Sequence, residues 1–232
     1  MTPNAAATMS ARRQSGFDRG AAVSRSLLGY GVLAGPFYLA VGLAQAAFRE
    51  GFDFRRHALS HLANGHLGWI QSVNFLLSGL MVVAAAVGVA RIGGREFRLT
   101  SRLVGAYGTA VFLAGIFRAD PVPGLPPGTP ENAAATMSTR GMLHFLVGGL
   151  GFVALAVGCL LAARGFARRG SNTGSRLSLV AGLVVVAGFF GPGYLPSVPA
   201  AMAALWVSVV VGWAWLAATS IYLYRASPSP NC

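Results

Sequence analysis

Six long apolar runs constrain the fold of this chain more than any motif, because each can cross a lipid bilayer as a helix. A membrane-spanning helix needs about 20 mostly apolar residues to cross about 30 Å of hydrocarbon. The runs that meet this requirement are residues 27–48, 69–90, 103–117, 142–163, 177–195 and 202–224. The third run reaches nearly full length only when it is extended back to Leu99. The sequence therefore predicts an all-α fold, a polytopic integral membrane bundle of six transmembrane helices.

Composition supports this class and argues against a nucleic-acid-binding protein. Hydrophobic residues make up 54% of the chain and charged residues only 10%, which is too apolar for an ordinary soluble domain. The net charge of +12 comes from arginines that lie between the apolar runs and form no continuous basic face. Since no RNA- or DNA-binding motif accompanies them, we expect the lipid bilayer, and no nucleic acid, as the partner. The oligomeric state stays open.

The distribution of arginine predicts the orientation in the membrane. With a cytoplasmic N-terminus, thirteen arginines fall on the inner side and five on the outer side, as the positive-inside rule requires. Both termini are then cytoplasmic: residues 1–26 form a disordered basic tail, residues 27–225 the transmembrane domain, and residues 226–232 a flexible C-terminus. The small residues Ala44-Gln45-Ala46 also allow a signal-peptide cleavage site, which would leave five spans. The first run is longer than a signal core, which favours an uncleaved anchor.

The predicted outer loop between the first two runs, residues 49–68, holds three of the four histidines. A short helix from Asp53 to Leu62 would put His57 and His61 on one face, with Ser60 on the same side. Two imidazoles at this spacing can ligate a divalent metal such as zinc. The other candidate ligands are Asp120 and His144, which lie at the outer ends of the third and fourth runs. Solvated interfacial histidines, or histidines that form hydrogen bonds or handle protons, are the alternatives.

Other polar residues fall near the same predicted outer surface. Asp120 could pair with His144 or form an ordinary ion pair with Arg118. The amides of Gln45, Gln71 and Asn74 are expected to bond across helices, since buried amides in lipid need partners. Arg55 and Arg56 could bind lipid phosphates or simply be solvated. The candidate polar pocket therefore comprises Asp53, Arg55, Arg56, His57, Ser60, Gln71, Asn74, Asp120 and His144.

Several short segments also carry a family resemblance. They are Gly31–Phe37, Phe54–Ser60, Asn64-Gly65, Gly68–Gln71, Asn74-Phe75, Phe117–Pro121 and His144-Phe145. From Leu28 to about Tyr222 the chain resembles domain-of-unknown-function family 998 (DUF998), a group of small bacterial multi-pass membrane proteins. The resemblance implies a bacterial inner membrane and points to His57, Ser60, Asp120 and His144. It implies no reaction.

Three functions follow from these patterns. The first is an integral membrane protein of unknown activity that binds a lipid, a small molecule or a partner in an extracytoplasmic polar pocket. The second is a membrane-embedded hydrolase or transferase for lipid or envelope substrates, with His57, His61, Asp120 and His144 holding a metal and its activated water. The third is a small-molecule transporter, which the nearly uncharged middles of the spans disfavour. Whether the chain is an enzyme stays open.

Overall fold

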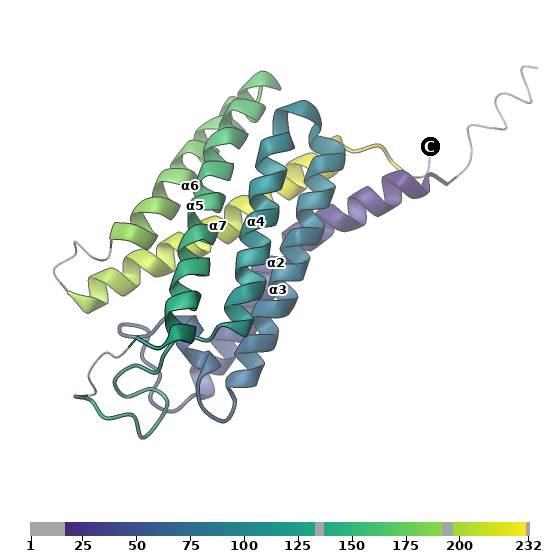
Figure 1. Ribbon diagram of the computed structural model, residues 1–232. Helices are drawn as coiled ribbons and strands as arrows, with labels where there is room; N and C mark the ends of the chain where they lie inside the picture. Colours follow the sequence, from purple (N-terminus) through teal and green to yellow (C-terminus); the bar gives the residue numbers. More distant parts are fainter. Residues whose placement is uncertain (1–16, 133–136, 192–196, 231–232) are drawn as a thin grey trace, which may run out of the picture.

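The computed structural model describes residues 17–132, 137–191 and 197–230, and this part of the chain is helical, as predicted (Figure 1). Residues 1–16 of the predicted tail lie outside the described residues. The helices are α2 (Arg19–Phe48), α3 (Gly68–Gly93), α4 (Arg98–Ile116), α5 (Thr139–Arg168), α6 (Asn172–Phe190) and α7 (Val198–Ala226). Two short 3₁₀ helices, η1 (Leu59–Ala63) and η2 (Gly94–Phe97), lie in connections.

Four helices, α2, α5, α6 and α7, begin where a polar side chain caps the first turn. The Asp18 side chain accepts a hydrogen bond from the Ala21 amide, so α2 starts at Arg19, before the apolar run. Ser138, Ser171 and Ser197 cap α5, α6 and α7 in the same way. Capping by short polar side chains therefore sets these boundaries, and the apolar runs alone do not.

Length and apolar composition identify a multi-pass membrane protein with five candidate membrane-spanning helices in the described residues. They are Arg19–Phe48, Gly68–Ile116, Thr139–Arg168, Asn172–Phe190 and Val198–Ala226. The second candidate is 49 residues long because it joins α3, η2 and α4 into one helical stretch. The predicted count of six spans is therefore not confirmed by this measure.

The six α-helices pack as a closed ring in which each contacts the next and α7 returns to contact α2. The described ends of the chain meet, since the Asp18 amide donates a hydrogen bond of 3.0 Å to the Pro230 carbonyl. Figure 1 shows α3 to α6 side by side, with α2 and α7 crossing behind them. The connecting residues 49–67 and 117–132 lie at one end of the bundle, here called the loop end (Figure 1). We call the opposite end, which holds η2 and both described termini, the termini end.

Small residues let the ring close tightly. A Cβ on Gly79 of α3 would lie 2.5 Å from the backbone nitrogen of Phe112 in α4, so these two helices pack backbone against backbone. On the other side, Gly35 of α2 makes room for Trp213 of α7. The Trp213 ring in turn contacts Tyr107 of α4, with ring centroids 5.8 Å apart across the ring of helices. Toward the loop end, the helices leave a space that the connections cover.

Candidate functional site

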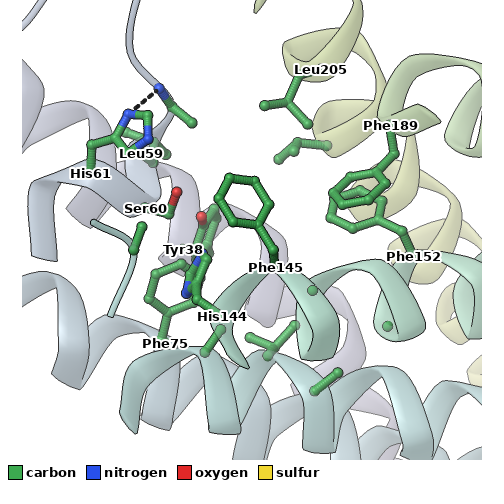
Figure 2. Close-up of a pocket in the computed structure, with 18 of the residues that line it drawn as sticks. Tyr38, Leu59, Ser60, His61, Phe75, His144, Phe145, Phe152, Phe189 and Leu205 are labelled. Atoms are coloured by element: carbon green, nitrogen blue, oxygen red, sulfur yellow. Dashed lines mark hydrogen bonds between the residues drawn. The ribbon is translucent and has the colours of Figure 1, made fainter. Parts of the chain in front are cut away.

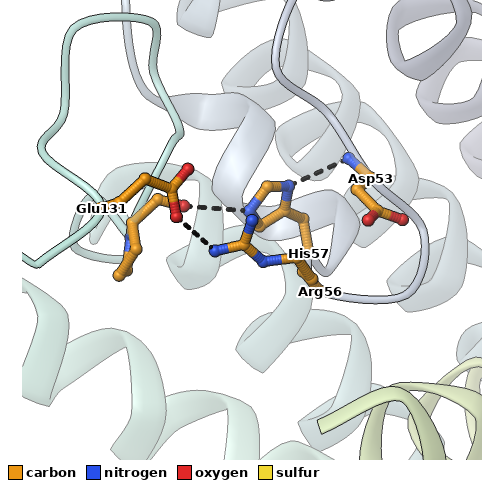
Figure 3. Close-up of polar contacts among 5 residues, drawn as sticks. Asp53, Arg56, His57 and Glu131 are labelled. Carbon is orange, nitrogen blue, oxygen red and sulfur yellow. Dashed lines mark hydrogen bonds and ion pairs between the residues drawn. The ribbon is translucent and has the colours of Figure 1, made fainter.

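Two connections form a cover over the loop end. We call this cover the cap and define it as residues 49–67 and 117–132. His57 lies at its centre and is only 2% exposed. Its Nδ1 accepts a hydrogen bond of 3.0 Å from the Asp53 amide, and its Nε2 lies 3.3 Å from the Pro123 carbonyl oxygen (Figure 3). Because a carbonyl only accepts, Nε2 carries the proton. Nδ1 therefore holds the turn of its own connection, and Nε2 joins the two connections.

A second link between the connections is an ion pair. The Arg56 guanidinium lies 2.7 Å from the Glu131 carboxylate (Figure 3). The hydrogen bond from Arg56, together with its charge, holds the pKa of Glu131 below its ordinary value. Both side chains are exposed, so water screens the pair and its contribution to stability is small. Arg55 is exposed as well, and its backbone amide bonds to the Asp53 side chain.

Asn64 and Arg49 complete the cap. The Asn64 side-chain amide donates to the Ala119 carbonyl at 3.0 Å, which again joins the two connections. Arg49, at the end of α2, donates to the carbonyls of Leu62 and Asn64. Leu62 is 1% exposed, so the segment that Arg49 holds is packed into the bundle. Polar side chains of the cap therefore bond to several of its backbone groups, which buried connections require.

The predicted loop helix from Asp53 to Leu62 is wrong. The Asp53 side chain accepts a hydrogen bond from the Arg55 amide, which makes a turn and competes with helix formation. The 3₁₀ helix η1 begins only at Leu59, so His57 precedes it and does not share a helix face with His61. The two imidazole rings are nevertheless near neighbours, with centroids 6.1 Å apart in an edge-to-face arrangement.

A cavity of about 220 Å³ lies beneath the cap, inside the ring of helices. Its wall is mostly apolar, and it includes eight aromatic residues that come from all six of the α-helices named above. They are Tyr38, Phe75, Tyr107, Phe145, Phe152, Phe189, Trp206 and Trp213. Figure 2 shows Phe152 and Phe189 on one side and Ser60, Tyr38 and His144 on the other, with Phe145 between the two groups. The cavity is thus apolar over most of its surface and polar where it meets the cap.

Ser60, His61 and His144 supply polar groups that line this cavity. The His61 Nδ1 accepts from the Ala58 amide at 3.2 Å, so Nε2 carries the proton and is a donor (Figure 2). Burial, with smaller effects from His57 and His144, lowers the pKa of His61 to about 4 and keeps the ring neutral near pH 7. The His144 Nδ1 lies 2.7 Å from the Phe117 carbonyl, so it donates there and leaves Nε2 as an acceptor.

Asp120, Gln71 and Asn74 are not among the described residues that line the cavity. Asp120 accepts from the backbone amide and the hydroxyl of Ser138 at the start of α5, and it pairs with neither His144 nor Arg118 in the described part of the chain. Gln71 and Asn74 bond across α2 and α3 instead. Gln45 donates to Gln71 at 2.8 Å, and Asn74 donates to the Tyr38 carbonyl. The predicted bonding of these amides across helices is confirmed.

The four residues predicted as metal ligands do not form one group. Over the described ranges, no three His, Cys, Asp or Glu side chains are placed to hold a metal ion. His57 has no ring nitrogen left for a ligand, and Asp120 is bonded to Ser138. Of these four residues, only His61 and His144 line the cavity.

Sequence reasoning missed the aromatic wall of the cavity. An aromatic residue in a transmembrane run can face either lipid or the bundle interior, and the run alone does not distinguish the two. Phe152 and Phe189 stack across α5 and α6, with ring centroids 4.3 Å apart. Trp206 attaches α7 to the cap, since its indole N–H donates to the Phe54 carbonyl. The one available signal was that Phe145, Phe189 and Trp206 all lie toward the predicted outer ends of their runs.

A family model described as a protein of unknown function (DUF998) matches residues 32–222, which reach from α2 to α7. Comparisons with curated proteins and with solved structures found no match. The family match includes both connections of the cap and every helix that lines the cavity. Since it covers most of the sequence, the chain belongs to the DUF998 family.

Proposed function

We propose that this chain is a bacterial inner-membrane protein that binds a small, mainly apolar ligand in the cavity beneath its cap. The observation that carries this proposal is the cavity itself: its lining combines aromatic residues from α2 to α7 with polar groups of Ser60, His61 and His144. An apolar pocket with a few convergent polar groups is the usual form of a small-molecule site. Its volume of about 220 Å³ exceeds the roughly 150 Å³ of an apolar cavity that accepts benzene.

A topology in which each of the six α-helices crosses the membrane separately is the one that fits this site. The backbone-to-backbone packing at Gly79 makes α3 and α4 a hairpin, and each is long enough to cross a bilayer by itself. The α4 helix has 19 residues, about 28 Å at 1.5 Å per residue, which matches the hydrocarbon thickness. Treated as two spans, α3 and α4 return the chain to the loop end before α5 begins.

The orientation that we propose has the loop end outside the cytoplasm. Among described residues, the termini end carries eleven arginines and the loop end carries five. The positive-inside rule then assigns the termini end to the cytoplasm. The cap and cavity face the extracytoplasmic side in this orientation, so a ligand reaches the site from the outer leaflet or the outer aqueous phase.

Binding of an uncharged bromoalkane tests the proposal. Bromine quenches tryptophan fluorescence on contact, and both Trp206 and Trp213 line the cavity. We expect 1-bromooctane to quench the purified protein with a saturable dependence on concentration. The Gly148→Leu variant should lose this saturable quenching, because Gly148 lines the cavity and an added Cβ there meets no heavy atom within 4 Å.

Gly29→Leu is the matched control. A Cβ on Gly29 also meets no heavy atom within 4 Å, but Gly29 lies in α2 toward the termini end and does not line the cavity. This variant should bind 1-bromooctane as the parent protein does. Linear, unsaturable quenching that is equal in the parent protein and both variants would show partition into detergent only and would refute the site.

A further inference from the structure

We infer that the cavity is specific for ligands whose polar group is an uncharged hydroxyl, such as a long-chain alcohol or another neutral lipid, and that it rejects charged head groups. This inference rests on the proposed function and names its ligand class. Three features support it. The described lining of the cavity carries no charged residue, the lining contains both a hydrogen-bond donor and an acceptor, and several charged side chains of the cap are bonded to other groups.

The described residues that line the cavity include no Arg, Asp or Glu. Four charged side chains of the neighbouring cap already have partners. Arg49 donates to two carbonyls, Arg56 pairs with Glu131, and Asp120 accepts from Ser138. A phosphate or carboxylate that entered the cavity would lose its hydration and find no opposite charge, which is strongly unfavourable.

The two histidines of the lining have opposite hydrogen-bonding roles. His61 is held by the Ala58 amide in the tautomer that offers an Nε2–H donor. His144 is held by the Phe117 carbonyl in the tautomer that offers an Nε2 lone pair. The Ser60 hydroxyl, which can donate or accept, lies beside them (Figure 2). A hydroxyl group accepts from one histidine and donates to the other, whereas a carboxylate or a phosphodiester can only accept.

The remainder of the ligand is defined by the aromatic wall. Phe145, Phe152 and Phe189 offer ring surfaces on which an alkyl or isoprenoid chain can pack, and they carry no polar atom. The affinity that this part of the ligand contributes therefore increases with the apolar area that it buries. The hydroxyl decides which apolar molecule is retained, because buried donors and acceptors left unpaired cost affinity.

Three probes with the same chain length test this specificity: 1-octanol, octane and octanoate, each competing with 1-bromooctane at neutral pH. We expect octanoate to bind at least tenfold more weakly than 1-octanol, because its carboxylate is charged. The His144→Phe variant keeps an aromatic ring but lacks the acceptor. It should bind 1-octanol about fivefold more weakly than the parent protein and bind octane with the same affinity. The control variant His66→Phe replaces an exposed histidine of the cap. It should change the affinity for neither 1-octanol nor octane.

The outcomes separate this inference from the proposed function. Saturable binding of all three probes with equal affinity would leave the site in place and overturn its specificity. Stronger binding of octanoate than of 1-octanol would also overturn the specificity. If none of the probes displaced 1-bromooctane, and 1-bromooctane itself showed no saturable quenching, the proposed function would fail and this inference with it.

Discussion

Replacing His57 with phenylalanine tests whether the most distinctive residue of the loop has a structural role. The substitution keeps an aromatic ring at a site that is 2% exposed, but it removes the hydrogen bonds to the Asp53 amide and the Pro123 carbonyl. Each such bond contributes about 1 kcal/mol net, so the loss is about 2 kcal/mol. The Asp53 amide and the Pro123 carbonyl lie near the surface, where water can replace part of the lost hydrogen bonding. The loss of stability should therefore not exceed this value.

The loss of stability in His57→Phe should be confined mainly to the cap. A change of about 2 kcal/mol raises the population of the locally open cap about 30-fold. Amide hydrogen exchange reports this directly at the Arg56 and His57 amides, which both donate to the Asp53 carbonyl. We expect these two amides to exchange about 30-fold faster in His57→Phe, while amides in the middle of α3 keep the parent rate.

His66→Phe provides the control, since His66 is exposed in the same connection. Its exchange pattern should match that of the parent protein, because surface substitutions usually change stability by less than about 0.5 kcal/mol. Unchanged exchange in His57→Phe would refute the structural role. Loss of a stoichiometric metal from that variant would instead restore the metal-ligand interpretation.

Three further predictions follow. Gly79→Val should destabilise the α3–α4 hairpin by about 1–3 kcal/mol, whereas Gly29→Val should not destabilise the protein. Thermal unfolding in detergent measures both effects, and equal effects would contradict the close packing at Gly79. Because burial lowers the pKa of His61 from 6.5 to about 4, stability should be constant above pH 6.5 and fall as pH decreases toward 4. His61→Phe should flatten this part of the unfolding profile, and an unchanged slope would contradict the assignment. In a chain without its native cysteines, Arg55→Cys should react with an impermeant maleimide in intact cells and Arg95→Cys only after permeabilisation; the reverse would overturn the orientation.

The fold could be predicted from the sequence because the bilayer sets a simple physical requirement. Runs of about 20 apolar residues must form helices, since no other backbone arrangement except a closed barrel satisfies its polar groups in lipid. The amide pair of Gln45 and Gln71 was predictable for the same reason: an amide among apolar helices must find a partner, and the facing helix provides one. The family resemblance, seen in short segments between Gly31 and Phe145, is confirmed by the match over residues 32–222.

The site could not be predicted as well, because backbone groups compete for its side chains. His57 and His61 have metal-ligand spacing in sequence, but the Asp53 turn breaks the expected helix and each ring accepts a hydrogen bond from a backbone amide. Spacing carries no information about such bonds. The aromatic wall was missed for a different reason. Phe145 and Phe152 have apolar neighbours in sequence, and such neighbours are equally compatible with a side chain that faces lipid and one that faces a cavity. Only the closure of the ring of helices decides between the two.

The most direct test of the account is an experimental structure of the protein with 8-bromo-1-octanol, in which anomalous scattering locates the bromine. We predict one bromine position among Phe145, Phe152 and Phe189, with the hydroxyl between the Nε2 atoms of His61 and His144. A bromine found only on the outer, lipid-facing surface of α5 or α6, with the cavity occupied by protein side chains, would contradict the central claim that the cap covers a ligand site.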